Sequence, residues 1–159
     1  MNDTQSKFHI QNWIIAILGL ALIALGAMNG SDNNKGEEIK LGASITAISL
    51  AKELCETNEE LNKVSYVYLK SSEVIKAFVV AYRDKDVKDL SLLVSELQVA
   101  IEDKFVEDGL VPDVPTTAVL TYIIAKIPEP NSDINTWLDK LLCLAEGLYY
   151  ASEELNKNQ

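Results

Sequence analysis

The sequence predicts an all-α protein in which a single N-terminal transmembrane helix is followed by a bundle of four long helices and one short helix. The prediction rests on an uncharged apolar run at residues 13–28, on apolar residues that recur every three or four positions downstream, and on capping signals between the periodic segments. Short turns between such segments are typical of helical hairpins. We therefore divide the chain into a polar leader (1–12), a transmembrane helix (13–28), a flexible linker (29–36) and a helical bundle (37–159).

The apolar run WIIAILGLALIALGAM has the composition of a membrane anchor. The uncharged window extends over residues 8–31, and a helix needs roughly 20 apolar residues to cross a bilayer. Small residues on one face would let two anchors pack closely, although ordinary glycine content of a membrane span explains them as well. A tryptophan at the start is typical of a membrane interface. The anchor residues of interest are Trp13, Gly19, Ile23, Gly26 and Met28.

Two other interpretations of the apolar run stay open from the sequence. The ALG sequence at residues 24–26 is a passable signal-peptidase site, and cleavage near Ala27 would release a secreted helical protein. A buried helix of a soluble core is disfavoured, because such a helix seldom stays apolar on all faces for four turns.

Charge bears on orientation and on partners. Lysines are nearly balanced about the apolar run, with Lys7 before it and Lys35 and Lys40 after it. We expect the N-terminus inside and the bundle outside the cytoplasm, as a periplasmic domain. The chain carries 24 Asp and Glu against 14 Lys and Arg, a net charge of −10. Because nucleic-acid binding needs clustered Lys and Arg to neutralise phosphates, we expect no nucleic-acid partner.

Apolar periodicity predicts the first long helix, at residues 37–56. Its predicted buried face carries Leu41, Ile45, Ile48, Ala51 and Cys55. A second apolar line beside it consists of Ala43, Ala47, Leu50 and Leu54.

The second long helix has the clearest start and the longest seam. Thr57 and Glu60 have the spacing of a capping box, in which each side chain accepts a hydrogen bond from a backbone amide at the helix start. Apolar and small residues then alternate at steps of three and four, which is typical of coiled-coil packing. This seam consists of Leu61, Val64, Tyr68, Ser71, Ile75, Phe78 and Tyr82.

Three further helices complete the predicted bundle. A charged turn at residues 83–86 with an Asp cap leads into an antiparallel helix that ends at Gly109. Residues 116–127 predict a short buried helix, with a strand as the alternative because the segment is rich in β-branched residues. Asn131 or Ser132 would cap the last helix. Its inward stripe consists of Ile134, Trp137, Leu138, Leu141, Ala145, Leu148 and Leu155.

The sequence indicates no catalytic, cofactor or metal site. The only histidine, His9, lies in the leader, so histidine-based nucleophile schemes and histidine zinc sites have no candidate in the bundle. Glutamates such as Glu59 and Glu60 stand at helix starts or on solvated faces, which is their ordinary place. We therefore expect no enzyme.

Two small groups of residues are candidates for a disulfide and for a contact surface. Cys55 and Cys143 are a candidate disulfide pair if the bundle is extracytoplasmic, although Cys143 does not follow the inward stripe. Gly147, Tyr149 and Tyr150 are a candidate contact surface, because aromatic residues gather at interfaces.

Taken together, these features favour a non-enzymatic single-pass membrane protein whose acidic bundle is an assembly, scaffolding or interaction module. Residues 13–28 would contact the lipid membrane, and the bundle would contact protein partners, as a homo-oligomer or a complex subunit. The first alternative is a phage-type lysis or membrane-permeabilising protein, because the layout is similar to that of holins with one membrane helix, without a shared motif. The second is the secreted helical protein.

Overall fold

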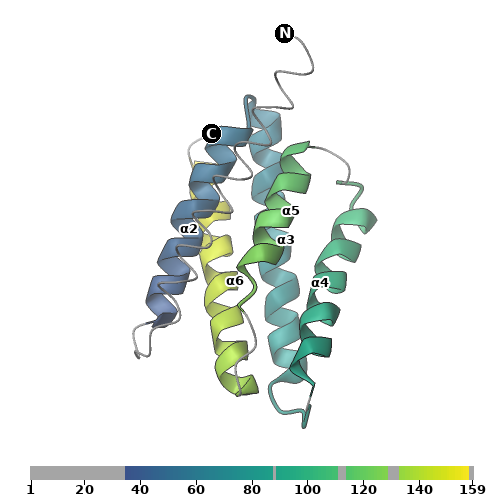
Figure 1. Cartoon of the computed structure of the whole chain (residues 1–159). Coiled ribbons are helices and arrows are strands. Elements are labelled where there is room, and N and C mark those ends of the chain that lie inside the picture. Colours follow the sequence, from purple (N-terminus) through teal and green to yellow (C-terminus); the bar gives the residue numbers. More distant parts are fainter. Residues whose placement is uncertain (1–34, 88, 111–113, 129–132, 158–159) are drawn as a thin grey trace.

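The fold is known from a computed structural model, which describes residues 35–87, 89–110, 114–128 and 133–157 (Figure 1). These residues form five α-helices and no strand, so the all-α prediction of four long helices and one short helix is confirmed for them. The helices are α2 (Lys35–Leu54), α3 (Asn58–Tyr82), α4 (Leu90–Glu107), α5 (Val114–Lys126) and α6 (Ile134–Lys157). The segment for which a strand was the alternative is therefore helical.

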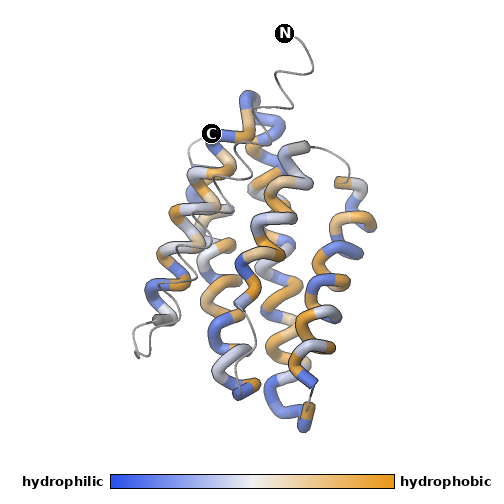
Figure 2. Tube along the Cα trace, in the orientation of Figure 1, coloured by the Kyte–Doolittle hydropathy of each residue, from blue (hydrophilic) through white to orange (hydrophobic). Residues whose placement is uncertain are grey.

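The helices form a bundle around α3 and α6. Helices α2, α4 and α6 run in one direction, while α3 and α5 run in the other (Figure 1). The most extensive packing joins α6 to α3 and to α2, and α5 lies against α3 and α2. Helix α4 packs mainly on α3, so it stands at the edge of the bundle (Figure 2). One whole side of α4 is therefore not covered by another described helix.

None of the described helices combines the length and the apolar character that a membrane span requires. The predicted leader and the predicted anchor, including Trp13, Gly19, Ile23, Gly26 and Met28, lie outside the described residues. So do Asn131 and Ser132. The leader, the membrane anchor and the cap at Asn131 or Ser132 therefore stay predictions.

The predicted inward faces of α3 and α6 lie in the core, together with residues of α2, α4 and α5. Every residue of the α3 seam is buried or partly buried, and the α6 stripe is buried from Trp137 onwards. Each large side chain withdrawn from water contributes roughly 2 kcal/mol to stability. The Trp137 indole N–H donates a 2.8 Å hydrogen bond to the Pro128 carbonyl, which satisfies its one polar group. The largest fully buried side chains include Trp137, Tyr68, Phe105, Ile75, Leu97, Ile101, Leu138, Leu141 and Leu148.

Two buried serines of α3 set its register against α6. The Ser65 hydroxyl donates a 3.0 Å hydrogen bond to the Ser152 carbonyl, and the Ser72 hydroxyl donates a 2.7 Å hydrogen bond to the Ala145 carbonyl. The two donors lie seven positions apart along α3, and the two acceptors lie seven positions apart along α6, in the reverse order because the helices are antiparallel. Sliding either helix by one turn would leave both hydroxyls buried without these partners, so the pairs specify one antiparallel alignment.

The buried face of α2 differs from the predicted one. Leu41 and Ile45, predicted to be buried, are 61% and 56% exposed, and the buried line runs through Ile39, Ala43, Ala47, Leu50 and Ala51. The reason is close packing against three other helices. The hydroxyls of Tyr68 and Tyr122 reach the α2 backbone, where they donate hydrogen bonds of 2.7 and 3.3 Å to the Ala47 and Ala43 carbonyls.

The predicted capping box at Thr57 is confirmed. The Thr57 hydroxyl accepts from the Glu60 amide, and the Glu60 carboxylate accepts from the Glu56 and Thr57 amides. The predicted stop at Gly109 is also confirmed, because this glycine has a φ of 67° and follows the last turn of α4.

Two predicted boundaries are wrong by a few residues. Helix α2 begins at Lys35, so the last two residues of the predicted linker are helical. Asp89, rather than an aspartate of the charged turn at residues 83–86, caps α4, because its carboxylate accepts a hydrogen bond from the Leu92 amide. Asp133 directly precedes α6, and its carboxylate accepts hydrogen bonds from the Asn135 amide and the Thr136 hydroxyl.

Candidate protein-interaction surface

Helix α2 exposes two large apolar side chains, and one of them lies beside a tyrosine of α6. Leu41 and Ile45 are more than half exposed, and Tyr150 is 47% exposed. A shallow groove between the two helices is lined by Glu37, Lys40, Leu41, Ser44 and Tyr150. We call the groove residues together with Ile45 the α2–α6 surface. Large aliphatic side chains left in water next to an aromatic ring are typical of contact sites.

Gly147 makes this surface by letting α2 and α6 approach closely. A Cβ at Gly147 would lie 2.6 Å from the Lys40 carbonyl oxygen and 2.9 Å from the Ala43 Cβ, so no larger residue fits there without movement. The contact buries Gly147 and turns the alanine line of α2 towards α6. It leaves Leu41, on the other side of α2, pointing to solvent beside Tyr150.

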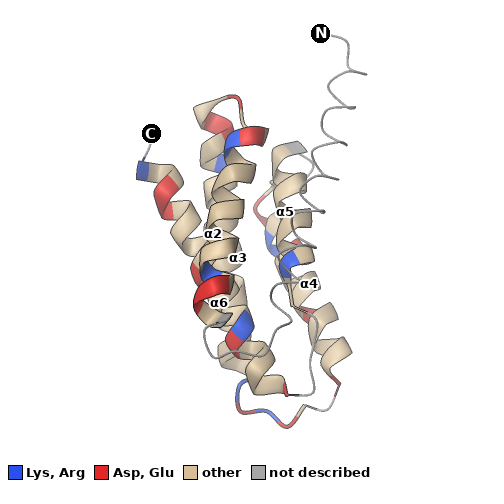
Figure 3. Ribbon diagram, turned by 60° about the vertical axis from the view of Figure 1, so that its left-hand side comes forward, with Lys and Arg blue, Asp and Glu red and all other residues tan. Residues whose placement is uncertain are grey.

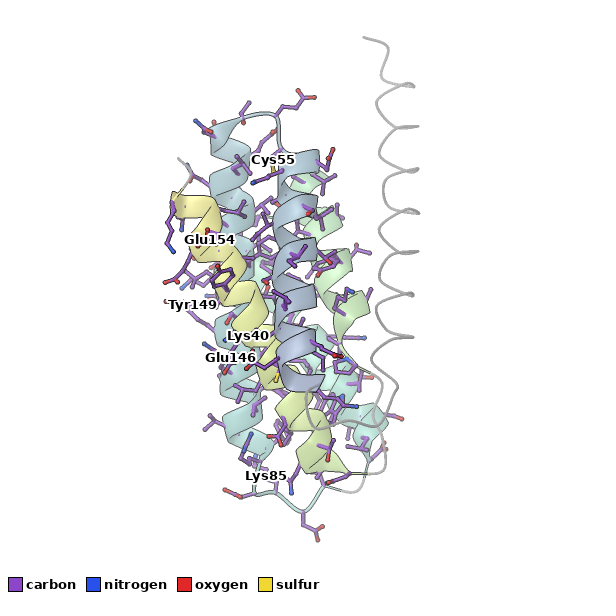
Figure 4. All side chains as sticks on the ribbon, turned by 90° about the vertical axis from the view of Figure 1, so that its left-hand side faces the viewer. Lys40, Cys55, Lys85, Glu146, Tyr149 and Glu154 are labelled. Carbon is purple, nitrogen blue, oxygen red and sulfur yellow. The ribbon has the colours of Figure 1, made fainter. Side chains whose placement is uncertain are left out.

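An ion pair crosses the two helices next to the groove. The Lys40 ammonium lies 3.9 Å from a Glu146 carboxylate oxygen, and the two side chains point toward one another in Figure 4. Both are about 40% exposed, so water screens the attraction and the pair contributes at most about 1 kcal/mol to stability. Its effect is to place one positive and one negative group at the rim of an apolar patch.

Tyr149 belongs to a different side of α6. Its ring lies 4.9 Å from the Lys76 ammonium of α3, and a hydrogen bond with Glu153 raises the pKa of its hydroxyl. Of the three predicted contact residues, the structure therefore places Tyr150 on the α2–α6 surface, buries Gly147 beneath it and turns Tyr149 towards α3.

The candidate disulfide is not formed, because α2 separates the two cysteines. The Cys143 sulfur lies 3.1 Å from the position of a Cβ at Gly36, in the first turn of α2, whereas Cys55 directly follows the last turn (Figure 4). A helix of 20 residues is about 30 Å long, while the Cα atoms of a disulfide lie within about 7 Å. Burial, and then the nearby Glu146 carboxylate, raise the pKa of the Cys143 thiol, so it is a weak nucleophile.

One buried cation lies away from this surface. Lys126, in the last turn of α5, is buried, and its ammonium lies 5.7 Å from the centre of the Tyr122 ring. Burial lowers its pKa. Among the described residues, no group of three or more His, Cys, Asp or Glu side chains is placed to hold a metal ion.

The sequence did contain a signal for the true orientation of α2. Alanines at 43, 47 and 51 recur every four residues, and small residues at this spacing mark a face on which another backbone approaches closely. The larger residues on the opposite side, Leu41 and Ile45, are then the exposed ones.

Comparisons with protein-family models, with curated proteins and with solved structures found no match.

Proposed function

We propose that this chain is a non-enzymatic, single-pass membrane protein whose acidic helical bundle serves as an assembly, scaffolding or interaction module of a membrane-associated complex. The observation that carries the proposal is the α2–α6 surface, where Leu41 lies exposed in a groove with Tyr150 and Ile45 lies exposed about one turn further along α2. Covering such side chains with another protein removes apolar area from water, which favours association by about 25 cal/mol per Å².

The polar residues of this surface would give it selectivity. The groove between Glu37, Lys40 and Tyr150 offers a negative group, a positive group and a phenol around an apolar floor. A partner that leaves these groups unpaired would bind more weakly, because a buried polar group without a hydrogen bond is costly. Tyr150 can keep its hydroxyl at the wet rim while its ring packs on the partner.

The proposed anchor would hold this surface close to the lipid. Six residues, 29–34, separate the predicted transmembrane helix from the start of α2, and a fully extended chain covers at most about 3.5 Å per residue. Leu41 lies less than two turns into α2. The partner is therefore expected to be another protein at the same membrane, either a second copy or a different subunit.

The absence of an enzymatic role in this proposal rests on the sequence of the bundle. The single histidine of the chain, His9, precedes the predicted anchor and so lies outside the bundle. The Cys143 thiol is a weak nucleophile, because its pKa is raised. The acidic charge of the bundle is likewise the basis for proposing protein rather than nucleic acid as the partner.

The experiment compares charge insertions at two exposed places. Full-length protein is extracted in mild detergent from membranes of cells that produce it, and complex size is measured by native gel electrophoresis and sedimentation velocity. Leu41→Glu combined with Ile45→Glu should release the chain from its complex. Val80→Glu, at a valine of α3 that is 80% exposed, is the matched control and should leave the complex intact. Complexes of equal size from all variants would refute the proposal.

A further inference from the structure

The outward side of α4 carries a second apolar line that the α2–α6 surface does not include. Leu92, Val99 and Val106 are each more than half exposed. They recur every seven residues, so they lie along one line of a helix, almost directly opposite the buried line of Leu93, Leu97, Ile101 and Phe105. At 1.5 Å per residue this exposed line is about 20 Å long, which is the length of a helix–helix contact.

Carboxylates flank this line on both sides. Glu96 and Asp103 stand on one side, where they line a shallow groove with Ser95, Val99 and Ala100, and Glu102 stands on the other. The one cation of α4, Lys104, is engaged by Glu107 and Asp108 at 3.5 and 3.3 Å. The exposed apolar line is therefore flanked by carboxylates, and α4 has no further cation that could neutralise them. We call Leu92, Val99 and Val106 with Glu96, Glu102 and Asp103 the α4 seam.

We propose that the α4 seam binds an amphipathic, basic helix of a partner protein. Heptad-spaced apolar side chains are what a second helix packs against, and charges beside the seam select the partner. A partner helix with apolar residues at the same spacing and Lys or Arg beside them would bury the valines and leucine and pair with the carboxylates. This charge complementarity also sets the orientation and speeds association.

The same charges argue against two other occupants. In a pair of α4 helices from two copies, the carboxylates flanking one seam would face those flanking the other, which is unfavourable. An anionic lipid surface would meet the same repulsion. Both occupants are distinguishable outcomes of the experiment below.

The experiment uses full-length protein in phosphatidylcholine nanodiscs, with empty nanodiscs as the blank. The probe is a fluorescent helical peptide about three heptads long, with leucine at the two core positions of each heptad and lysine elsewhere. A peptide of equal composition, with its leucines moved off the heptad spacing, is the control. Anisotropy should show binding of the heptad peptide at least tenfold tighter than binding of the control peptide.

Variants separate seam packing from simple charge attraction. Val99→Glu adds a negative charge, so charge attraction alone predicts equal or tighter peptide binding, whereas the α4 seam predicts binding about tenfold weaker. Val80→Glu, the same change on α3, should leave binding unchanged. Glu96→Gln with Asp103→Asn should weaken binding and reduce its dependence on salt. Circular dichroism checks that each variant folds.

Four other outcomes of this experiment bear on the α4 seam. Equal binding by both peptides, or no effect of Val99→Glu, would overturn the proposal. Concentration-dependent dimers that Val99→Glu abolishes, without peptide binding, would assign the seam to a second copy and also overturn it. Binding to phosphatidylserine nanodiscs without peptide binding would assign it to lipid. Leu41→Glu should leave peptide binding unchanged, so this test can fail while the α2–α6 surface stands.

Discussion

Gly147 of α6 lies so close to Lys40 of α2 that a Cβ there would be 2.6 Å from the Lys40 carbonyl oxygen. The two helices run parallel, and the approach continues to Ala43, whose Cβ would lie at 2.9 Å. This contact fixes which side of α2 is buried. It thereby determines that Leu41 faces solvent beside Tyr150, and the candidate surface depends on it.

Gly147→Ala should destabilise the bundle by about 2 kcal/mol, because the added methyl overlaps backbone atoms of α2. The higher helix propensity of alanine offsets only part of this cost. The control is Gly42→Ala in α2, where a Cβ would meet nothing within 4 Å, and it should be neutral or stabilising by up to about 1 kcal/mol. Urea unfolding followed by circular dichroism measures both. Equal stability of the two variants would mean that α2 and α6 do not touch at this glycine.

Ser72→Ala should cost about 1 kcal/mol of unfolding free energy, since it removes a buried hydrogen bond to the Ala145 carbonyl. Ser95→Ala removes an exposed hydroxyl that bonds only within α4, at Ser91, and should change stability by less than about 0.5 kcal/mol. Thermal or urea unfolding of the two single variants decides the point. A Ser72→Ala protein as stable as Ser95→Ala would contradict the alignment of α3 with α6.

Buried tyrosines should make the bundle sensitive to alkali. Burial raises the pKa of Tyr68 and of Tyr122 above the ordinary value of 10.0. The folded state therefore holds these protons more tightly than the unfolded state. Their contribution is complete below pH 10 and is lost as the pH rises from there towards the folded-state pKa values. Stability measured by urea unfolding should accordingly fall above pH 10.

A spectroscopic titration tests the same point directly. Tyrosinate absorbance should rise in steps, with Tyr68 and Tyr122 ionising only as the chain unfolds. Tyr68→Phe should remove one late-titrating group from the six tyrosines. If all six tyrosines ionise before circular dichroism reports unfolding, the buried placement of this pair is wrong.

Reductant should leave the unfolding free energy unchanged, because Cys55 and Cys143 lie at opposite ends of α2. A disulfide between them would close a long loop and contribute several kcal/mol, roughly 3 to 5. Urea unfolding with and without dithiothreitol makes the comparison. A large loss of stability on reduction, absent in Cys143→Ser, would show that the two cysteines pair.

Much of the fold was predictable where one apolar face is distinct. The α3 seam and the α6 stripe alternate cleanly with polar residues, and the capping box at Thr57 needs only local backbone geometry. Helix α2 was not predictable in this way, because apolar residues line more than one of its sides. Its orientation depends on Gly147, Tyr68 and Tyr122, which come from other helices far along the chain.

The candidate surface was predictable only in part, for the same reason. Tyr150 stood out because exposed aromatic residues are common at interfaces. The sequence predicts Leu41 and Ile45 to be core residues, because the apolar pattern alone does not distinguish a face that packs inside the bundle from one that stays exposed. The sequence predicts the cap of α4 within the charged turn at residues 83–86, whereas the structure has it at Asp89. The acidic charge spread over the bundle (Figure 3) was evident from composition.

Site-specific photo-crosslinking in membranes tests the central claim most directly. Benzoylphenylalanine replaces Leu41 in the full-length chain, with Val80 as the matched exposed position on α3. The α2–α6 surface predicts one discrete protein adduct from position 41 and none from position 80. An adduct at twice the 17.6 kDa of the chain would identify a second copy as the partner. No protein adduct from position 41 beyond that from position 80 would contradict the claim.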